Sequence, residues 1–171
     1  EREPFCLHIS LLCDARKNVK RLIDASVKYN FKLVLGGILR NEQEKKLLDS
    51  WIRDKPNVTY MGYISYDTML DLYKRAKVFA LPSIYEGVGV VALDAAAMGC
   101  DIVITRLGGP KEYYNNMAVE VNPYSIDEIG LAVSQLMQGQ TFQPDLRKYI
   151  LENYSLKNIS EQLEMAFSIV L

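Results

Sequence analysis

The chain has 171 residues, enough for one domain with a hydrophobic core, and its 49% hydrophobic and 24% charged residues are typical of globular proteins. The formal net charge of −1 argues against a nucleic-acid-binding protein, which would carry an excess of lysine and arginine. No apolar run approaches the roughly 20 residues that a membrane span requires, so we expect neither a signal peptide nor a transmembrane segment.

The cysteines are typical of a reducing compartment. Cys6, Cys13 and Cys100 are odd in number and widely spaced, and the sequence contains no CxxC pair. His8 is the only histidine, which argues against a structural zinc site. We therefore expect reduced thiols in a cytoplasmic protein, and a core or surface position for His8. Because the chain begins at Glu1 and enters a strand almost at once, we expect it to be part of a longer protein.

Short apolar runs alternate with helical patterns along the whole chain. The predicted strands are, in chain order, residues 5–12, 31–35, 58–61, 78–81, 101–105 and 117–121. Gly36 and Gly37 close the second of them. Helical patterns follow the strands at residues 19–27, 41–52, 65–73 and 126–137. The apolar helix within residues 81–99 follows the fourth strand, and a short helical piece follows Gly108, Gly109 and Pro110. Two further helices are predicted around residues 145–152 and 155–171. The helix that Ser65 opens should bury Tyr66, Met69, Leu70 and Tyr73.

This alternation predicts an α/β fold, with a Rossmann-like, doubly wound parallel sheet of about six strands and helices on both faces. In such sheets the ligand lies outside the carboxyl ends of the strands. The turns at these ends are residues 12–17, 36–37, 62–63, 82–89 and 106–112, and they hold the glycines and charges that a site needs. We see no linker and no repeat, so residues 1–171 should form a single domain.

The stretch LPSIYEGVGVVALDAAAMG at residues 81–99 organises the rest of the chain. It ends a strand, passes Glu86 and two glycines, and enters a helix that is apolar nearly all round, which predicts a buried helix. A helix N-terminus offers free N–H groups and a partial positive charge to an anion. Asp94 interrupts the apolar helix, and a carboxylate there needs a partner. These features suit a phosphorylated ligand that carries hydroxyl groups.

Glu86 and Asp94, with seven residues between them, resemble the E-x7-E segment of retaining glycosyltransferases of the GT4 family, which have the two-domain GT-B fold. Pro82 and Ser83 before the loop match the family as well, and residues 108–112 (GGPKE) resemble its GGxxE turn. The resemblance extends from about residue 7 to residue 137. It implies that the chain is the C-terminal, donor-binding half of a GT-B enzyme, whose N-terminal acceptor domain lies outside these residues.

The resemblance also implies roles for individual residues. Glu86 would contact the donor sugar and act in catalysis. Asp94, usually a glutamate, would hold the ribose hydroxyls, unless local backbone satisfies it instead. Lys17 would pair with the donor diphosphate, helped by Arg16, although both could equally be solvated turn residues. The backbone N–H groups of Gly87, Val88, Gly89 and Val90 would bind the distal phosphate, or the glycines could serve only as a flexible helix entry.

Gly62 and Tyr63 lie where the resemblance places the nucleotide base. Tyr63 could stack on the base or simply cover the sheet edge. Gly108 and Gly109 are expected to shape a turn rather than to touch the ligand. The chain departs from the family at Leu11, which stands near the position where an arginine usually follows the first strand. One cation for the diphosphate is therefore missing from its usual place.

These observations predict an enzyme that transfers a sugar from a nucleoside diphosphate sugar to an acceptor, with no metal or other cofactor, in polysaccharide or glycoconjugate synthesis. Its partners would be the donor and its own N-terminal domain, and the full-length protein would be cytoplasmic or peripheral at a membrane. We expect the 171 residues alone to bind nucleotide and to transfer little sugar. The alternative, favoured by Leu11 and Asp94, is a non-catalytic GT-B-like binding or partner module.

Two other classes of enzyme predict features that the sequence lacks. A nicotinamide-dependent dehydrogenase would have GxGxxG after the first strand, where ISLLCDARKN contains no glycine. A sugar-nucleotide epimerase of similar fold would have additional histidines. In the last predicted helix, Ile159, Leu163, Ala166, Phe167 and Val170 form an apolar stripe, which could dock on this domain, reach the other domain, or cause dimerisation.

Overall fold

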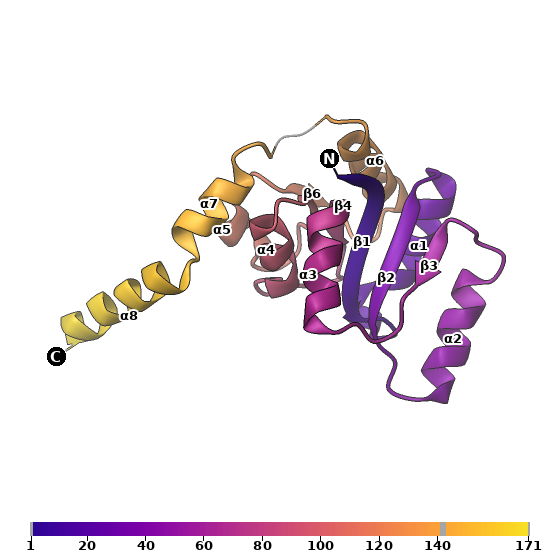
Figure 1. Cartoon of the computed structure of the whole chain (residues 1–171), viewed down its shortest axis with the longest axis horizontal. Helices are drawn as coiled ribbons and strands as arrows, with labels where there is room; N and C mark the ends of the chain where they lie inside the picture. The colour runs from indigo at the N-terminus through magenta and orange to yellow at the C-terminus, as the bar shows by residue number, and fades with distance from the viewer. Residues whose placement is uncertain (1, 141–142, 171) are drawn as a thin grey trace.

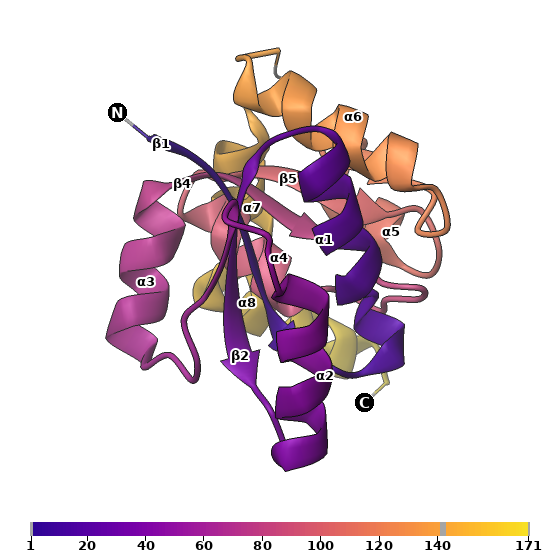
Figure 2. The same cartoon turned by 90° about the vertical axis from the view of Figure 1, so that its right-hand side faces the viewer.

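The computed structural model describes residues 2–140 and 143–170, which form a parallel sheet covered by helices on both faces (Figures 1 and 2). The six strands found there are β1 (Glu3–Leu11), β2 (Lys32–Ile38), β3 (Val58–Tyr60), β4 (Ala76–Leu81), β5 (Asp101–Thr105) and β6 (Val119–Val121). Their order in the sheet is β3-β2-β1-β4-β5-β6, and every pairing is parallel. The predicted fold class is confirmed.

Helices connect the strands in the alternation that the sequence predicts. They are α1 (Val19–Lys28), α2 (Glu42–Ile52), α3 (Tyr66–Arg75), α4 (Val90–Ala97), α5 (Pro110–Tyr114), α6 (Ile126–Met137), α7 (Leu146–Asn153) and α8 (Leu156–Val170). A short 3-10 helix, η1 (Ala15–Lys17), occupies the turn after β1. Ser65 and Ser125 begin α3 and α6 because each hydroxyl accepts a hydrogen bond from the backbone N–H three residues later.

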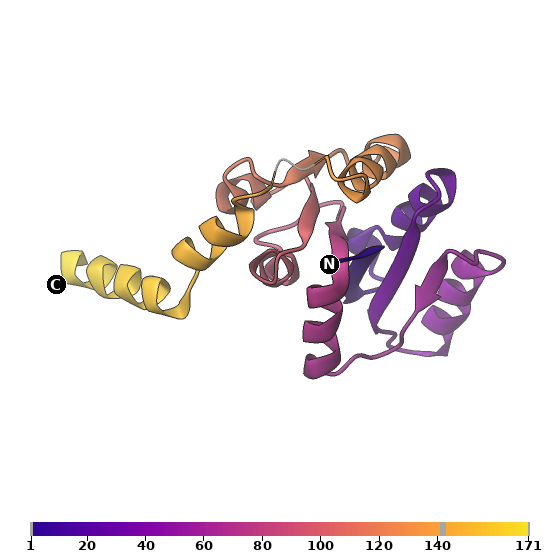
Figure 3. The ribbon, with the colours of Figure 1, turned by 45° about the horizontal axis from the view of Figure 1, so that its top comes forward.

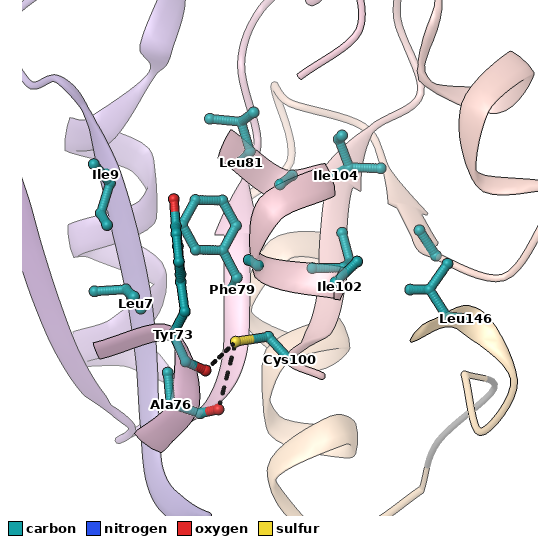
Figure 4. Close-up of a cluster of buried hydrophobic side chains, with 14 of the residues drawn as sticks. Leu7, Ile9, Tyr73, Ala76, Phe79, Leu81, Cys100, Ile102, Ile104 and Leu146 are labelled. Atoms are coloured by element: carbon teal, nitrogen blue, oxygen red, sulfur yellow. Dashed lines mark hydrogen bonds between the residues drawn. The ribbon is translucent and has the colours of Figure 1, made fainter. Parts of the chain in front are cut away.

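The core has two halves, one on each face of the sheet. Leu7 and Ile9 of β1 point to the half covered by α3, α4 and α7, part of which is drawn in Figure 4. Cys6 belongs to the opposite half, covered by α1, α2 and α6. This alternation follows from the two-residue repeat of a strand, and it explains why both faces of the central strands are apolar.

β2 is longer than predicted, and its glycines have a different purpose from closing a strand. Gly36 and Gly37 pair in register with Ile9 and Ser10 of β1, and the strand continues to Ile38. A Cβ atom at Gly37 would lie 1.9 Å from the carbonyl oxygen of Ser10. The glycine is therefore required by the close approach of β1.

Two expectations about buried helix faces are wrong in part. In α3 Tyr73 is buried as expected and Met69 and Leu70 are half-buried, whereas Tyr66 in the first turn is 69% exposed and Leu72 is buried. In α4 the buried residues are small alanines, and the opposite side is open: Val90 is 61% exposed and Asp94 is exposed as well. An apolar composition all round thus marks a helix with one side in the core and the other in an apolar cleft.

The C-terminal helices leave the body of the domain. α7 packs on α4, whereas α8 projects away from the sheet (Figure 3). Its predicted apolar stripe is exposed at Ile159, Leu163, Ala166 and Phe167. Leu171 and the side chain of Val170 lie outside the described residues.

Candidate functional site

The strand order changes direction between β1 and β4, and the two loops that follow these strands build the site. Such a switch point is where open α/β sheets bind ligands. The Nζ atom of Lys17, after β1, lies 2.8 Å from Oε2 of Glu86, after β4. The hydroxyl of Ser83 donates to the same oxygen at 2.9 Å. The side chains of Lys17 and Glu86 are 23% and 14% exposed, so their ion pair is largely shielded from solvent.

Backbone contacts hold the two loops against each other. The N–H of Ile84 donates to the carbonyl oxygen of Arg16 at 2.7 Å. On the other side, Glu86 forms a parallel bridge with Gly108: its N–H donates to Leu107, and its carbonyl accepts from Gly109 at 3.0 Å. The loop that carries Glu86 is therefore held between the loops that follow β1 and β5. We call these contacts the clamp, and they fix the position of the carboxylate.

The GGxxE turn is part of this clamp. Gly108 has a φ angle of +103°, and a Cβ atom there would lie 1.9 Å from the carbonyl oxygen of Glu86. Only glycine tolerates both conditions. Glu112 is exposed on α5, away from these contacts. The expectation that these glycines shape a turn agrees with their geometry.

The N-terminus of α4 opens beside Glu86. Among the described residues, the backbone N–H groups of residues 87–91 donate no hydrogen bond. Gly89 takes the left-handed conformation at the N-cap (φ 72°), and its carbonyl accepts from the buried hydroxyl of Tyr114 at 3.2 Å. The result is a run of unpaired N–H groups at the positive end of a helix, arranged to bind an anion.

Asp94 stands one turn further along α4, on its open side. Within the described residues its carboxylate has no hydrogen-bond partner, and partial burial raises its pKa above the usual value. It lies on the rim between two pockets of about 170 and 380 Å³, the first beside α3 and the second beside α7. The structure therefore leaves this carboxylate open to a ligand and does not satisfy it with local backbone.

Arg16 has a local partner instead of a place in the ion pair. Its guanidinium binds both oxygens of Asp14, at 3.2 and 2.9 Å, and its side chain is 74% exposed. Because these bonds stabilise the carboxylate, the pKa of Asp14 falls to about 2. Glu86 adds to the raised pKa of Arg16 through its charge alone. Arg16 is thus near the site without touching it.

The predicted base site borders two pockets at the ends of β1, β2 and β3. Gly62 has a φ angle of +75°, and its carbonyl accepts from the N–H of Gly37 at 3.1 Å. Tyr63 is 76% exposed and stands between a pocket of about 680 Å³ over α2 and an apolar one of about 230 Å³. Leu11 lines the apolar pocket where the family's arginine would be expected.

His8 lies buried below the site. Its Nδ1 atom is 2.7 Å from the carbonyl oxygen of Ala80, and its Nε2 atom is 2.7 Å from the hydroxyl of Ser10. A carbonyl can only accept, so Nδ1 carries the proton and Ser10 donates to Nε2. Burial lowers the pKa of His8 to about 4, and the ring is neutral. His8 and Ser83 are the supporting residues for which sequence reasoning assigned no function.

The described residues contain neither a metal-binding cluster nor a membrane-spanning helix. No group of three or more histidine, cysteine, aspartate or glutamate side chains there is arranged to hold a metal ion. No helix among them combines the length and the hydropathy needed to cross a bilayer.

The chain was compared with known proteins. Residues 3–154 match the family model described as Glycosyl transferases group 1. An uncharacterized glycosyltransferase of Methanocaldococcus jannaschii is 30% identical over 168 residues, which cover 91% of this chain and 43% of that protein. The O-antigen chain mannosyltransferase B of Escherichia coli is 25% identical over 152 residues, covering 81% of this chain and 38% of that protein.

Solved structures show the same fold. Sucrose-phosphate synthase from Thermosynechococcus elongatus superimposes with a TM-score of 0.86 at 21% identity, over 98% of this chain and 45% of that one. A glycosyltransferase from Rickettsia africae gives 0.81 at 17% identity, over 99% and 48%. The chain spans less than half the length of each of these four proteins.

Proposed function

The chain belongs to the family described as Glycosyl transferases group 1, and from this membership we propose that it is the donor-binding half of a retaining, GT-B-type glycosyltransferase. Its ligand would be a nucleoside diphosphate sugar. The observation that carries this proposal is the Lys17–Glu86 ion pair, which faces unpaired N–H groups at the start of α4. A cation, a carboxylate and a helix N-terminus at one switch point match a donor with a diphosphate and a sugar.

The diphosphate would lie against the helix N-terminus. The N–H groups of Gly87, Val88, Gly89 and Val90 supply donors, and Lys17 supplies the positive charge. In the structure Lys17 is bound to Glu86, so a diphosphate would have to take over this ammonium group. Lys17 would then stabilise the negative charge on the departing nucleoside diphosphate, without a metal ion.

Glu86 would act on the sugar. Its Oε2 atom accepts from Lys17 and Ser83, whereas Oε1 has no partner within the described residues. Oε1 is therefore the atom that could accept from a sugar hydroxyl or stabilise positive charge that develops on the anomeric carbon. The clamp on its loop would keep that oxygen in place during the reaction.

The nucleoside would extend from α4 towards β2. Asp94 would accept hydrogen bonds from the ribose hydroxyls, because a carboxylate has two oxygens for two neighbouring hydroxyls. The apolar pocket of about 230 Å³, bordered by Tyr63, would receive the base. Gly62 would allow the backbone to approach it. Arg16 stays a weaker candidate, since Asp14 already binds its guanidinium.

The acceptor would bind to a second domain outside this chain, so the whole enzyme would transfer a sugar and this chain alone would transfer little. The resemblance to an O-antigen mannosyltransferase supports a role in polysaccharide or glycoconjugate synthesis, with the cytoplasm as the expected location. The competing proposal, a non-catalytic module, is favoured by Leu11, which carries no charge, and by the Arg16–Asp14 pair, which occupies the guanidinium of Arg16.

Calorimetric titration with UDP, GDP and ADP tests the proposal. We expect one diphosphate to bind, and Lys17→Met to weaken that binding at least about tenfold, because a charge-assisted hydrogen bond is lost. Lys20→Met is the matched control, since this lysine is exposed on α1 and bound to Asp24. Equal binding by the Lys17 variant and the wild type, or no binding of any diphosphate, would contradict the proposal. If a diphosphate binds, a sugar-transfer assay of the parent enzyme distinguishes the proposed transferase from the non-catalytic module.

A further inference from the structure

Tyr73 carries a buried hydroxyl that packing alone does not explain. Its side chain is completely buried on α3, and its ring packs edge-on against Phe79, with 5.7 Å between ring centroids. Within the described residues the hydroxyl has no hydrogen-bond partner. An unpaired buried hydroxyl destabilises a fold, and phenylalanine would fill the same space without that cost. The hydroxyl therefore calls for an explanation beyond packing.

The hydroxyl of Tyr73 points towards the candidate site. In Figure 4 it is directed towards Ile9 and Leu81, near the carboxyl ends of β1 and β4, while the backbone of Tyr73 lies near Ala76 and Cys100. This direction is the usual one for a helical residue, whose side chain leans back towards the helix N-terminus.

A potential partner stands on the neighbouring helix. Tyr73 and Asp94 line the same pocket of about 170 Å³, between α3 and α4. Within the described residues the carboxylate of Asp94 has no hydrogen-bond partner, and its charge adds to the burial that raises the pKa of Tyr73. Two residues that each carry an unpaired polar group among the described residues thus line one small pocket, from two helices that pack together. The pocket is smaller than the roughly 300 Å³ of a typical ligand site, so it suits one ring of a ligand.

Met69 is shared by this pocket and by the pocket proposed for the base. It lies one turn before Tyr73 on α3, where a tyrosine side chain leans over it. It lines this pocket and also the apolar pocket of about 230 Å³ that borders Tyr63. A methionine has three flexible side-chain bonds, so a ligand that spans both pockets can displace it at little cost.

We propose that Tyr73 is a positioning residue for Asp94: when a ligand displaces Met69, the Tyr73 hydroxyl donates a hydrogen bond to one oxygen of the Asp94 carboxylate. The other oxygen then faces the 2′- and 3′-hydroxyls of the ribose. This inference rests on the proposed function, and it adds a residue and a conformational step to it. In the structure the Tyr73 hydroxyl makes no such bond, and the proposed bond forms with binding.

The test compares two single variants and their double variant in the binding of ribonucleotides and of dideoxynucleotides. Tyr73→Phe, Asp94→Ala and the double variant are titrated with UDP, GDP and ADP, and with their 2′,3′-dideoxy forms. We expect Tyr73→Phe to weaken binding of the ribonucleotide about tenfold, the usual effect of one hydrogen bond to a charged group. It should leave binding of the dideoxynucleotide unchanged, and it should add nothing in the Asp94→Ala background.

Thermal unfolding separates positioning from packing. Because the hydroxyl is unpaired, the Tyr73→Phe variant should melt at or above the wild-type temperature. The inference is overturned if Tyr73→Phe binds the ribonucleotide as tightly as the wild type, or if it weakens ribo- and dideoxynucleotides equally. A wild type that binds none of the three diphosphates overturns the proposed function, and this inference with it.

Discussion

At the scale of single residues, the site depends on a carboxylate that is held through one of its two oxygens. Lys17 and Ser83 both bind Oε2 of Glu86, which leaves Oε1 without a partner among the described residues. In the proposed function the same arrangement would make Glu86 a competitor of the diphosphate for Lys17. Donor binding and sugar transfer would then place opposite demands on this residue.

Replacement of Glu86 by glutamine should separate these demands. The neutral amide holds Lys17 less firmly, so Glu86→Gln should bind a nucleoside diphosphate as tightly as the wild type or up to about tenfold more tightly. Sugar transfer by the parent enzyme should fall about 100-fold, because the charge opposite the anomeric carbon is lost. Calorimetry and a transfer assay measure the two effects. Glu112→Gln, on the exposed side of α5, is the control, and wild-type transfer by Glu86→Gln would refute the role.

His8 makes stability depend on pH. Its pKa is about 4 in the folded protein and 6.5 when unfolded, so the unfolded chain binds the extra proton between these values. The stabilisation is present above pH 6.5 and is lost as the pH falls towards 4, by up to about 3 kcal/mol. Denaturant unfolding at pH 7 and pH 5 measures the change. As His8 is the only histidine, His8→Asn should remove most of it, and an unchanged pH dependence would be the contrary result.

At the scale of elements, the glycines differ in purpose although several share a positive φ angle. Gly62 has a φ of +75° with no atom within 4 Å of a Cβ position, whereas at Gly108 (φ +103°) that position collides with the backbone of Glu86. We expect Gly62→Ala to lower the free energy of unfolding by about 1 kcal/mol, from backbone strain alone. Gly108→Ala should cost about 3 kcal/mol or more, since the clamp must also shift.

Denaturant unfolding of both variants provides the comparison. In Gly108→Ala nucleotide binding should be lost together with the clamp. Similar losses of stability in the two variants would mean that the bridge between Glu86 and Gly108 does not hold the loop.

Much of the element order could be predicted, because apolar runs of strand length and helical spacing are local signals. The continuation of β2 through Gly36 and Gly37 could not, because it depends on the approach of β1. For α4 the composition alone suggested burial on all sides. Its open side exists because α3 and α7 flank the helix without closing over Asp94, and no periodicity in residues 90–97 reveals that. The resemblance suggested a role for Asp94, whereas the unpaired hydroxyl of Tyr73 could only be found in three dimensions.

At the scale of the whole molecule, helices cover both faces of the sheet, and two regions of the domain are exposed. The carboxyl edge of the sheet exposes the candidate site, and α8 carries exposed apolar side chains away from the body (Figure 3). Less than half the length of the matched relatives is represented here. In the proposed function donor binding would reside in these residues, and acceptor binding would reside in a second domain.

The pairing of β4 with β1 also determines the stage of folding at which the proposed donor site forms. Lys17 and Glu86 are 69 positions apart in the chain, and they meet only after β2, β3 and their helices have been passed over and β4 has paired with β1. A contact between residues so far apart in the chain forms late in folding, because the loop between them must lose conformational entropy before the contact can stabilise the fold. Each half of the chain folded by itself would hold one half of the ion pair. Affinity for the donor should therefore arise in one step, with the closing of the centre of the sheet.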